Sequence, residues 1–153
     1  MGRRSKKLSR EEQMEVEEWI YQNNTEEKRI SDTMTVSVKC KTENQKALVN
    51  AIKEKEVIIC SGPAGTGKTY LACAEALKLI KRYAKYKKIV IVKSVTTLKN
   101  EEIGFLKGGL REKMEPFMFS FVHNFEKLVG QTITSRLREL KTIEELPIAY
   151  MRG

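Results

Sequence analysis

Residues 56–82 read EVIICSGPAGTGKTYLACAEALKLIKR, and this stretch decides the predicted fold. Its first five residues, EVIIC, contain a continuous apolar run rich in β-branched side chains, which is typical of a strand buried on both faces of a parallel sheet. Residues 62–69, GPAGTGKT, match the pattern G-x-x-x-x-G-K-[ST]. From Lys68 onward the apolar residues recur with helical spacing. One face of this predicted helix carries Ala72, Ala76, Leu79, Ile80 and Tyr83.

The glycine-rich loop has the residues that a phosphate-binding loop needs. Gly62, Gly65 and Gly67 allow the backbone to curl so that successive N–H groups point inward. The positive end of the following helix adds to this field. Lys68 can bridge the β- and γ-phosphates and is the predicted catalytic residue, while the Thr69 hydroxyl is placed to ligate Mg²⁺. The predicted nucleotide-binding residues in this loop are Gly62, Pro63, Ala64, Gly65, Thr66, Gly67, Lys68, Thr69 and Tyr70.

The elements on either side of this stretch complete an α/β pattern. Residues 33–39 alternate between apolar and polar side chains, which predicts a half-buried strand or an extended segment. Thr42 can cap a helix over 43–54. The run KIVIV at 88–92 predicts a second buried strand, so strand, helix and strand together have the size of a βαβ unit.

The C-terminal part predicts two helices and a third strand. A stripe of apolar residues predicts a helix from Pro116 to about 129, with Gly130 ending it. A short helix is expected over 134–140, and a strand over 146–150. At the other end of the chain, a basic tip precedes a short helix with a partial apolar face, which either docks on the body or on a partner, or stays solvated.

Composition limits the class of protein and its partners. The net charge is +9 over 153 residues, which suits a polyanion such as nucleic acid and also suits a basic surface with no partner. No apolar run approaches the roughly 18 residues of a membrane span, so no membrane partner is expected. The cysteines 40, 60 and 73 have neither metal-site nor disulfide spacing, which predicts reduced thiols in a cytoplasmic protein.

Several motifs together resemble the PhoH family of P-loop ATPases, a RecA-like group related to superfamily 1 helicases. The loop at 62–69 is joined by ENQKALVNAI upstream and by YMRG at 150–153. The stretch EEIGFLKGGLREKMEPF is similar to the family signature after the second strand. Its matching residues are Glu101, Gly104, Phe105, Leu106, Gly108, Leu110, Glu112, Lys113 and Pro116.

The resemblance implies a fold and further site residues. The implied fold is a three-layer αβα P-loop NTPase core with a parallel sheet, here incomplete, preceded by the short helix. Gln45 stands where helicase relatives contact the adenine edge. Lys93, Thr96 and Thr97 stand where those relatives touch a nucleic-acid backbone. Lys93-Ser94 replaces the usual Arg-Pro of the family, and this departure puts partner contacts in that region in doubt.

The sequence lacks one expected catalytic motif. P-loop ATPases have an apolar strand that ends in Asp or Asp-Glu, which holds Mg²⁺ and polarises the attacking water. No aspartate follows Asp32, and no glutamate after Thr69 ends an apolar strand. We therefore expect a basic tip and short helix over 1–32, and a P-loop domain over 33–153 that stops before the Asp-Glu strand. An unpaired strand edge would then favour homo-oligomers or pairing with a C-terminal half.

Three functions remain open at this stage. The first is a Mg²⁺-dependent ATPase that binds ATP or ADP and is linked to RNA, single-stranded nucleic acid or the phosphate-starvation response, with slow hydrolysis by this chain. The second is a nucleotide-responsive binding or assembly module without useful turnover. The third is a small-molecule kinase, against which the Gln45 segment and the GFLKG motif argue.

Overall fold

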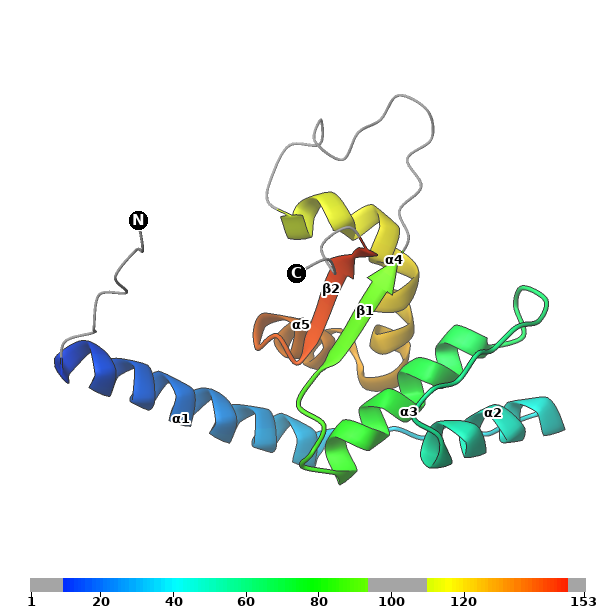
Figure 1. Cartoon of the computed structure of the whole chain (residues 1–153), viewed down its shortest axis with the longest axis horizontal. Helices are drawn as coiled ribbons and strands as arrows, with labels where there is room; N and C mark the ends of the chain where they lie inside the picture. The colour runs from blue at the N-terminus through cyan, green and yellow to red at the C-terminus, as the bar shows by residue number, and fades with distance from the viewer. Residues whose placement is uncertain (1–9, 94–109, 149–153) are drawn as a thin grey trace, which may run out of the picture.

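The computed structural model describes residues 10–93 and 110–148 of the 153-residue chain. Its elements follow the order α1 (Arg10–Thr33), α2 (Glu43–Glu54), α3 (Lys68–Arg82), β1 (Ile89–Lys93), α4 (Leu110–Val129), α5 (Gln131–Glu139) and β2 (Ile143–Pro147). Figure 1 shows α2 and α3 side by side, with α1 extending away from the sheet. No helix in these two ranges combines the length and hydropathy needed to cross a membrane.

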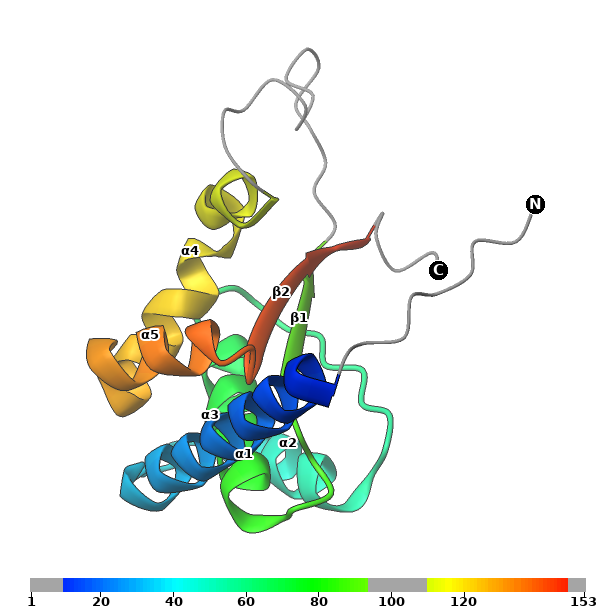
Figure 2. The same cartoon turned by 90° about the vertical axis from the view of Figure 1, so that its left-hand side faces the viewer.

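The sheet consists of β1 and β2, which pair in parallel. In this register Ile89 lies opposite Ile143 and Ile91 lies opposite Glu145, so these side chains share one face. That face is the covered one, since Ile91 and Ile143 are buried while Val90 and Val92 on the other face are exposed. The chain is thus α/β with a small parallel sheet, as predicted in outline (Figure 2).

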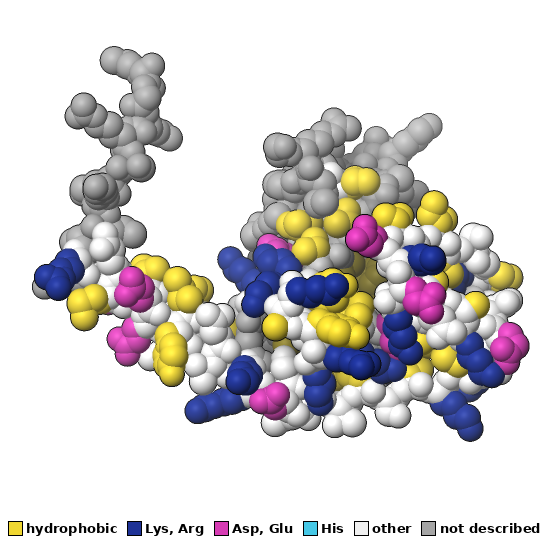
Figure 3. Space-filling view, turned by 60° about the horizontal axis from the view of Figure 1, so that its bottom comes forward, with side chains coloured by type: hydrophobic (Ala, Val, Ile, Leu, Met, Phe, Trp, Pro, Cys, Tyr) yellow, Lys and Arg dark blue, Asp and Glu magenta, His cyan; other side chains and the backbone are white. Residues whose placement is uncertain are grey.

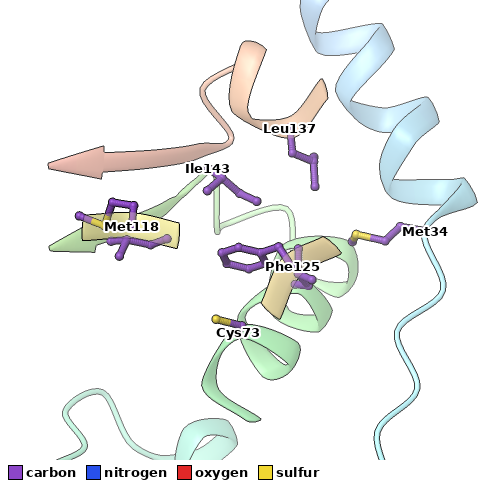
Figure 4. Close-up of a cluster of buried hydrophobic side chains, with 8 residues drawn as sticks. Met34, Cys73, Met118, Phe125, Leu137 and Ile143 are labelled. Atoms are coloured by element: carbon purple, nitrogen blue, oxygen red, sulfur yellow. The ribbon is translucent and has the colours of Figure 1, made fainter. Parts of the chain in front are cut away.

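The hydrophobic core joins α3, α4, α5 and the two strands around the covered face of the sheet, together with Met34, which follows α1. Phe125 and Met118 of α4 are completely buried between α3, α5 and the strands. Figure 4 shows Phe125 pointing among side chains from several other elements. The core residues are Met34, Cys73, Leu77, Ile91, Met118, Phe125, Leu137 and Ile143. Burying such side chains contributes about 1.5–3 kcal/mol each, which fixes α3 against the sheet.

The predicted strand at 56–60 is wrong. These residues form no strand, and Val57 and Ile59 are 83% and 94% exposed. A strand needs a partner for its ladder, and β1 and β2 pair only with each other within the described ranges. The apolar run therefore stays unpaired, although its composition is that of a buried strand.

The other strands also differ from prediction. β1 is one residue later than expected and is buried on one face only. β2 begins three residues earlier than predicted, at Ile143. Two glutamates, Glu144 and Glu145, interrupt its apolar pattern, so a search for apolar runs misses this strand. Both glutamates form ion pairs. Lys88 binds Glu144 at 2.8 Å, and Arg138 binds Glu145 at 2.7 Å.

Residues 34–40 form neither a helix nor a strand, and they keep the predicted alternation of burial. Met34 is buried, Val36 and Val38 are half-buried, and the residues between them are exposed. α4 starts at Leu110, so Pro116 lies inside the helix and not at its start as predicted. The predicted stripe of α4 is confirmed by its burial, and Gly130 ends the helix as expected.

The buried face of α3 is broader than the predicted one. Ala72 is exposed and Tyr83 is 41% exposed, although both were expected on the apolar face. Neighbours on two sides explain the difference, because α2 packs on one side of α3 while α4 and β1 pack on another. The buried residues of α3 are Leu71, Cys73, Ala74, Glu75 and Leu77.

Candidate functional site

The glycine-rich loop, residues 62–69, connects the exposed 56–60 segment to α3 (Figure 1). Its backbone has left-handed conformations at Gly65, with φ of 75°, and at Gly67, with φ of 85°. L-residues avoid such conformations, at a cost of roughly 1–2 kcal/mol. An added Cβ at Gly65 would meet nothing within 4 Å, so backbone conformation and not crowding requires glycine there.

The Lys68 ammonium lies against the loop's own backbone. Its Nζ donates to the carbonyl oxygens of Gly62 at 2.8 Å and Pro63 at 2.6 Å, and approaches the Thr66 hydroxyl at 3.4 Å. The Thr66 hydroxyl in turn donates to the Pro63 carbonyl at 2.9 Å. The first residue of α3 therefore closes the loop into a ring with its cation directed inward.

Gln45 ties α2 to this loop. Its side-chain Nε2 donates to the Thr66 carbonyl at 3.1 Å, and its Oε1 accepts from the Lys41 N–H at 2.7 Å. Its backbone N–H donates to the Thr42 hydroxyl, which caps α2 as predicted. Both ends of the side-chain amide are thus bonded to backbone, so Gln45 holds the loop in place. The adenine contact implied by the resemblance stays a prediction.

A cavity of about 380 Å³ lies between α2 and the loop. This volume falls within the range of small-molecule sites, roughly 300–1,000 Å³. Four of the predicted loop residues and Gln45 line it: Gly62, Pro63, Thr66, Lys68 and Gln45. Sequence reasoning missed its other lining residues: Thr42, Asn44, Leu48, Cys60, Ser61 and Leu71. Several of these lie within one turn of Gln45, a spacing that could have pointed to them.

The remaining predicted site residues lie apart from the cavity lining. Ala64, Gly65 and Thr69 are exposed on the loop, Gly67 is the N-cap of α3, and Tyr70 is half-buried in its first turn. Lys93 is half-buried at the end of β1, opposite Pro147. Thr96 and Thr97 fall outside the described residues.

The start of α3 suits an anion and a phosphate-bound cation. The first N–H groups of a helix have no intrahelical partner and carry the positive end of its dipole. The Thr69 hydroxyl is exposed there. Within residues 10–93 and 110–148, no three metal-ligating side chains gather, so a Mg²⁺ ion at Thr69 would need phosphate and water oxygens for its other ligands. That is the usual way Mg²⁺ accompanies a nucleotide.

Two cysteines near the site differ in environment. Cys60 is exposed in the cavity lining, one residue before Ser61. Cys73 faces the core behind α3, and burial raises the pKa of its thiol to about 11. Cys73 therefore stays protonated and unreactive near neutral pH, while Cys60 is open to reagents that enter the cavity.

Comparison with known proteins places the chain in a family. A family profile described as "PhoH-like protein" matches residues 37–153. The chain is 35% identical over 147 residues to the "PhoH-like protein" of Bacillus subtilis (strain 168), covering 96% of this chain and 44% of that protein. It is 30% identical over 121 residues to "Protein PhoH" of Escherichia coli (strain K12), covering 78% of this chain and 34% of that protein.

A third relative is the "PhoH-like protein" of Mycobacterium tuberculosis (strain ATCC 25618 / H37Rv), 35% identical over 117 residues, covering 76% of this chain and 33% of that protein. No solved structure matches the chain. The chain spans less than half the length of each of these relatives. The profile match and the relatives, together with the glycine-rich loop, show that this chain belongs to the PhoH-like protein family.

Proposed function

We propose that the chain binds a nucleoside triphosphate, ATP in the first place, with its phosphates in the 62–69 loop. The observation that carries this proposal is the Lys68 ammonium, directed into a loop whose glycines take left-handed conformations. The cavity beside the loop supplies room for the rest of the nucleotide. The resemblance to P-loop ATPases supports a RecA-like core as the frame of this site.

Each residue of the loop has a part in the proposed chemistry. Lys68 exchanges its bonds to the Gly62 and Pro63 carbonyls for bonds to phosphate oxygens, because a charged acceptor binds an ammonium more strongly than a neutral one. Loop amides and Lys68 then stabilise the charge that develops on the transferred phosphoryl group. Mg²⁺, when bound with the nucleotide, offsets charge on the β- and γ-phosphates, and Thr69 would hold it.

We propose that hydrolysis by this chain is slow. The sequence has no Asp-Glu strand to activate water, and no acidic cluster lies in the described part of the chain. The same observation favours a second candidate, a module whose nucleotide binding drives assembly with little turnover. Nucleic acid is the proposed partner in both cases, on the strength of the +9 charge and the family resemblance.

Phosphate release from ATP, with and without RNA, tests this proposal. We expect turnover well below about 1 per second, the low end for ordinary enzymes, and we expect Lys68→Ala to remove it. Lys53→Ala, which changes an exposed lysine near the end of α2, is the matched control. Turnover of about 1 per second or more would contradict slow hydrolysis. Activity that survives Lys68→Ala would show that the loop is not the site.

A further inference from the structure

The turn between α3 and β1 is strongly basic. Residues 82–88 read RYAKYKK, with four basic residues and no acidic one, and all seven are exposed. Basic residues in the last turn of a helix suit its dipole, and this accounts for Arg82. Lys85, Lys87 and Lys88 lie beyond the end of the helix, where the dipole gives no such reason. We call residues 82–88 the basic turn.

Two tyrosines stand among these cations. Tyr83 and Tyr86 are each 41% exposed, and their ring centroids lie 6.2 Å apart in an edge-to-face arrangement. The Arg82 guanidinium carbon lies 5.4 Å from the Tyr83 centroid, and Lys85 Nζ lies 4.8 Å from the Tyr86 centroid. Attraction between cation and ring holds these charges beside the aromatic surfaces.

Among the side chains that the structure describes, three cations of the basic turn have no carboxylate partner. Lys88 pairs with Glu144 at 2.8 Å. In contrast, no carboxylate whose side chain the structure describes forms an ion pair with Arg82, Lys85 or Lys87. Figure 3 shows this side of the molecule, where Lys and Arg side chains surround exposed hydrophobic ones and outnumber acidic neighbours at the centre of the face.

We propose that the basic turn binds single-stranded nucleic acid, with Arg82, Lys85 and Lys87 on phosphates and Tyr83 and Tyr86 against bases. Exposed aromatic rings can stack on the unpaired bases of a single strand, and neighbouring cations can bind the phosphates of its backbone. A duplex keeps its bases stacked inside and would leave the rings without a partner. A membrane surface needs apolar side chains to insert, and residues 82–88 offer only Ala84 besides the tyrosines.

This surface is separate from the nucleotide site. α3 starts in the glycine-rich loop and ends in the basic turn, so its 15 residues separate the two by about 22 Å. The inference rests on the nucleic-acid partner proposed above and names where that partner binds. It differs from the contact implied at Lys93, because Lys93 ends β1 while the basic turn precedes that strand.

Fluorescence anisotropy with a labelled 20-nucleotide oligouridine tests this surface at several KCl concentrations. The variant Arg82→Gln/Lys85→Gln/Lys87→Gln should bind at least tenfold more weakly. Each lost phosphate contact changes the slope of log affinity against log salt by about 0.7, so the slope should fall by about 2. The control Arg10→Gln/Lys127→Gln/Lys141→Asn removes the same charge from other exposed sites and should change affinity less than twofold.

The tyrosines separate nucleic acid from other polyanions. Tyr83→Leu/Tyr86→Leu should weaken oligouridine severalfold with the salt slope unchanged, and should leave heparin binding unaffected. If this double variant does not fold, Tyr86→Leu alone repeats the test, because Tyr86 is exposed and lies outside the helices and strands; it should weaken oligouridine binding and leave heparin binding unaffected. Equal affinity of the triple variant and its control, an unaffected tyrosine variant, or tighter binding to phosphatidylserine vesicles than to oligouridine would overturn the proposal.

The same samples separate this inference from the proposed function. Lys68→Ala should bind oligouridine like the unaltered chain, and the basic-turn variant should bind Mg-ATP like the unaltered chain. If the basic-turn variant bound oligouridine as tightly as the unaltered chain, the proposed surface would be overturned. The proposal of a nucleic-acid partner would still stand. If the unaltered chain did not bind oligouridine, both the proposed surface and the proposed nucleic-acid partner would be overturned. Mg-ATP binding by the same chain would still test the nucleotide site separately.

Discussion

The side-chain amide of Gln45 donates to the backbone carbonyl of Thr66 at 3.1 Å, joining two residues 21 positions apart. The other end of the same amide accepts from the Lys41 N–H. The glycine-rich loop is therefore held from outside by α2 and from inside by Lys68. Its shape depends on both contacts, and this makes Gln45 a positioning residue of the site.

Gln45→Ala should weaken nucleotide binding through the shape of the loop. Loss of a hydrogen bond costs about 1 kcal/mol, so we expect a fall in affinity of about five- to tenfold. ATP and GTP should weaken alike, because the Gln45 contacts are to backbone. Titration with both nucleotides measures this, with Asn50→Ala, an exposed residue on α2, as the control. A loss confined to ATP would instead indicate the adenine contact that the family resemblance implies.

Glu26→Gln should loosen α1 from α5. Arg136 donates to Glu26 through two nitrogens at 2.6 and 2.5 Å, and these bonds hold the pKa of Glu26 below its ordinary value. The anisotropy of Trp19, the single tryptophan and part of α1, should fall in the variant and not in the control Glu17→Gln.

The pH dependence of this pair has a definite direction. Because the folded-state pKa of Glu26 is lowered, its contribution is present above the ordinary glutamate pKa of 4.5 and is lost as pH falls through the folded value. The unaltered chain should therefore approach the variant's Trp19 anisotropy only in acid. Identical anisotropy of the two proteins at neutral pH would show that the pair does not hold α1.

Cys73 should make the protein less stable at alkaline pH. An unfolded cysteine ionises from about pH 9.0, whereas the buried thiol stays protonated up to about 11. Between these values the unfolded state gains ionisation free energy that the folded state lacks, so stability falls as pH rises. Relative to Cys73→Ala, the free energy of unfolding should fall by on the order of 2 kcal/mol across this window. Urea denaturation at both ends of the window checks this, and a constant difference would contradict it.

Cys60 should be protected by nucleotide. Its thiol is exposed in the cavity lining, so a maleimide should modify it faster than buried Cys73. Bound Mg-ATP would occupy the same cavity and slow this reaction several-fold. Mass spectrometry of timed samples gives the rate at each cysteine, and half-buried Cys40 serves as the internal reference. Equal slowing at Cys40 and Cys60 would mean that protection is not local to the cavity.

The sequence predicted the parts of the fold whose cause is local. The cap at Thr42, the end of α4 at Gly130 and the glycine positions of the loop each follow from the conformation of a few neighbouring residues. The loop pattern predicted that Lys68 contacts phosphates, but it did not predict the bonds of Lys68 to the Gly62 and Pro63 carbonyls, which the structure shows.

The parts that failed depend on partners distant in sequence. The residues 56–60 predict a strand, but they do not show whether another strand pairs with them. In the structure they pair with neither β1 nor β2, and the apolar segment is exposed. The strand β2 was not predicted at its observed start because its glutamates make it polar. The residues that neutralise them, Lys88 and Arg138, lie outside the strand. The cavity lining was only partly predicted for the same reason, since it needs α2 to pack beside the loop.

Calorimetric titration of the chain with Mg-bound, non-hydrolysable ATP tests the central claim most directly. The unaltered chain and Lys53→Ala should bind with one site per chain, and Lys68→Ala should bind at least tenfold more weakly, with all three proteins showing the same helical circular dichroism. Equal affinity of Lys68→Ala and the unaltered chain, or no binding by the unaltered chain, would contradict the assignment of residues 62–69 as a nucleotide site.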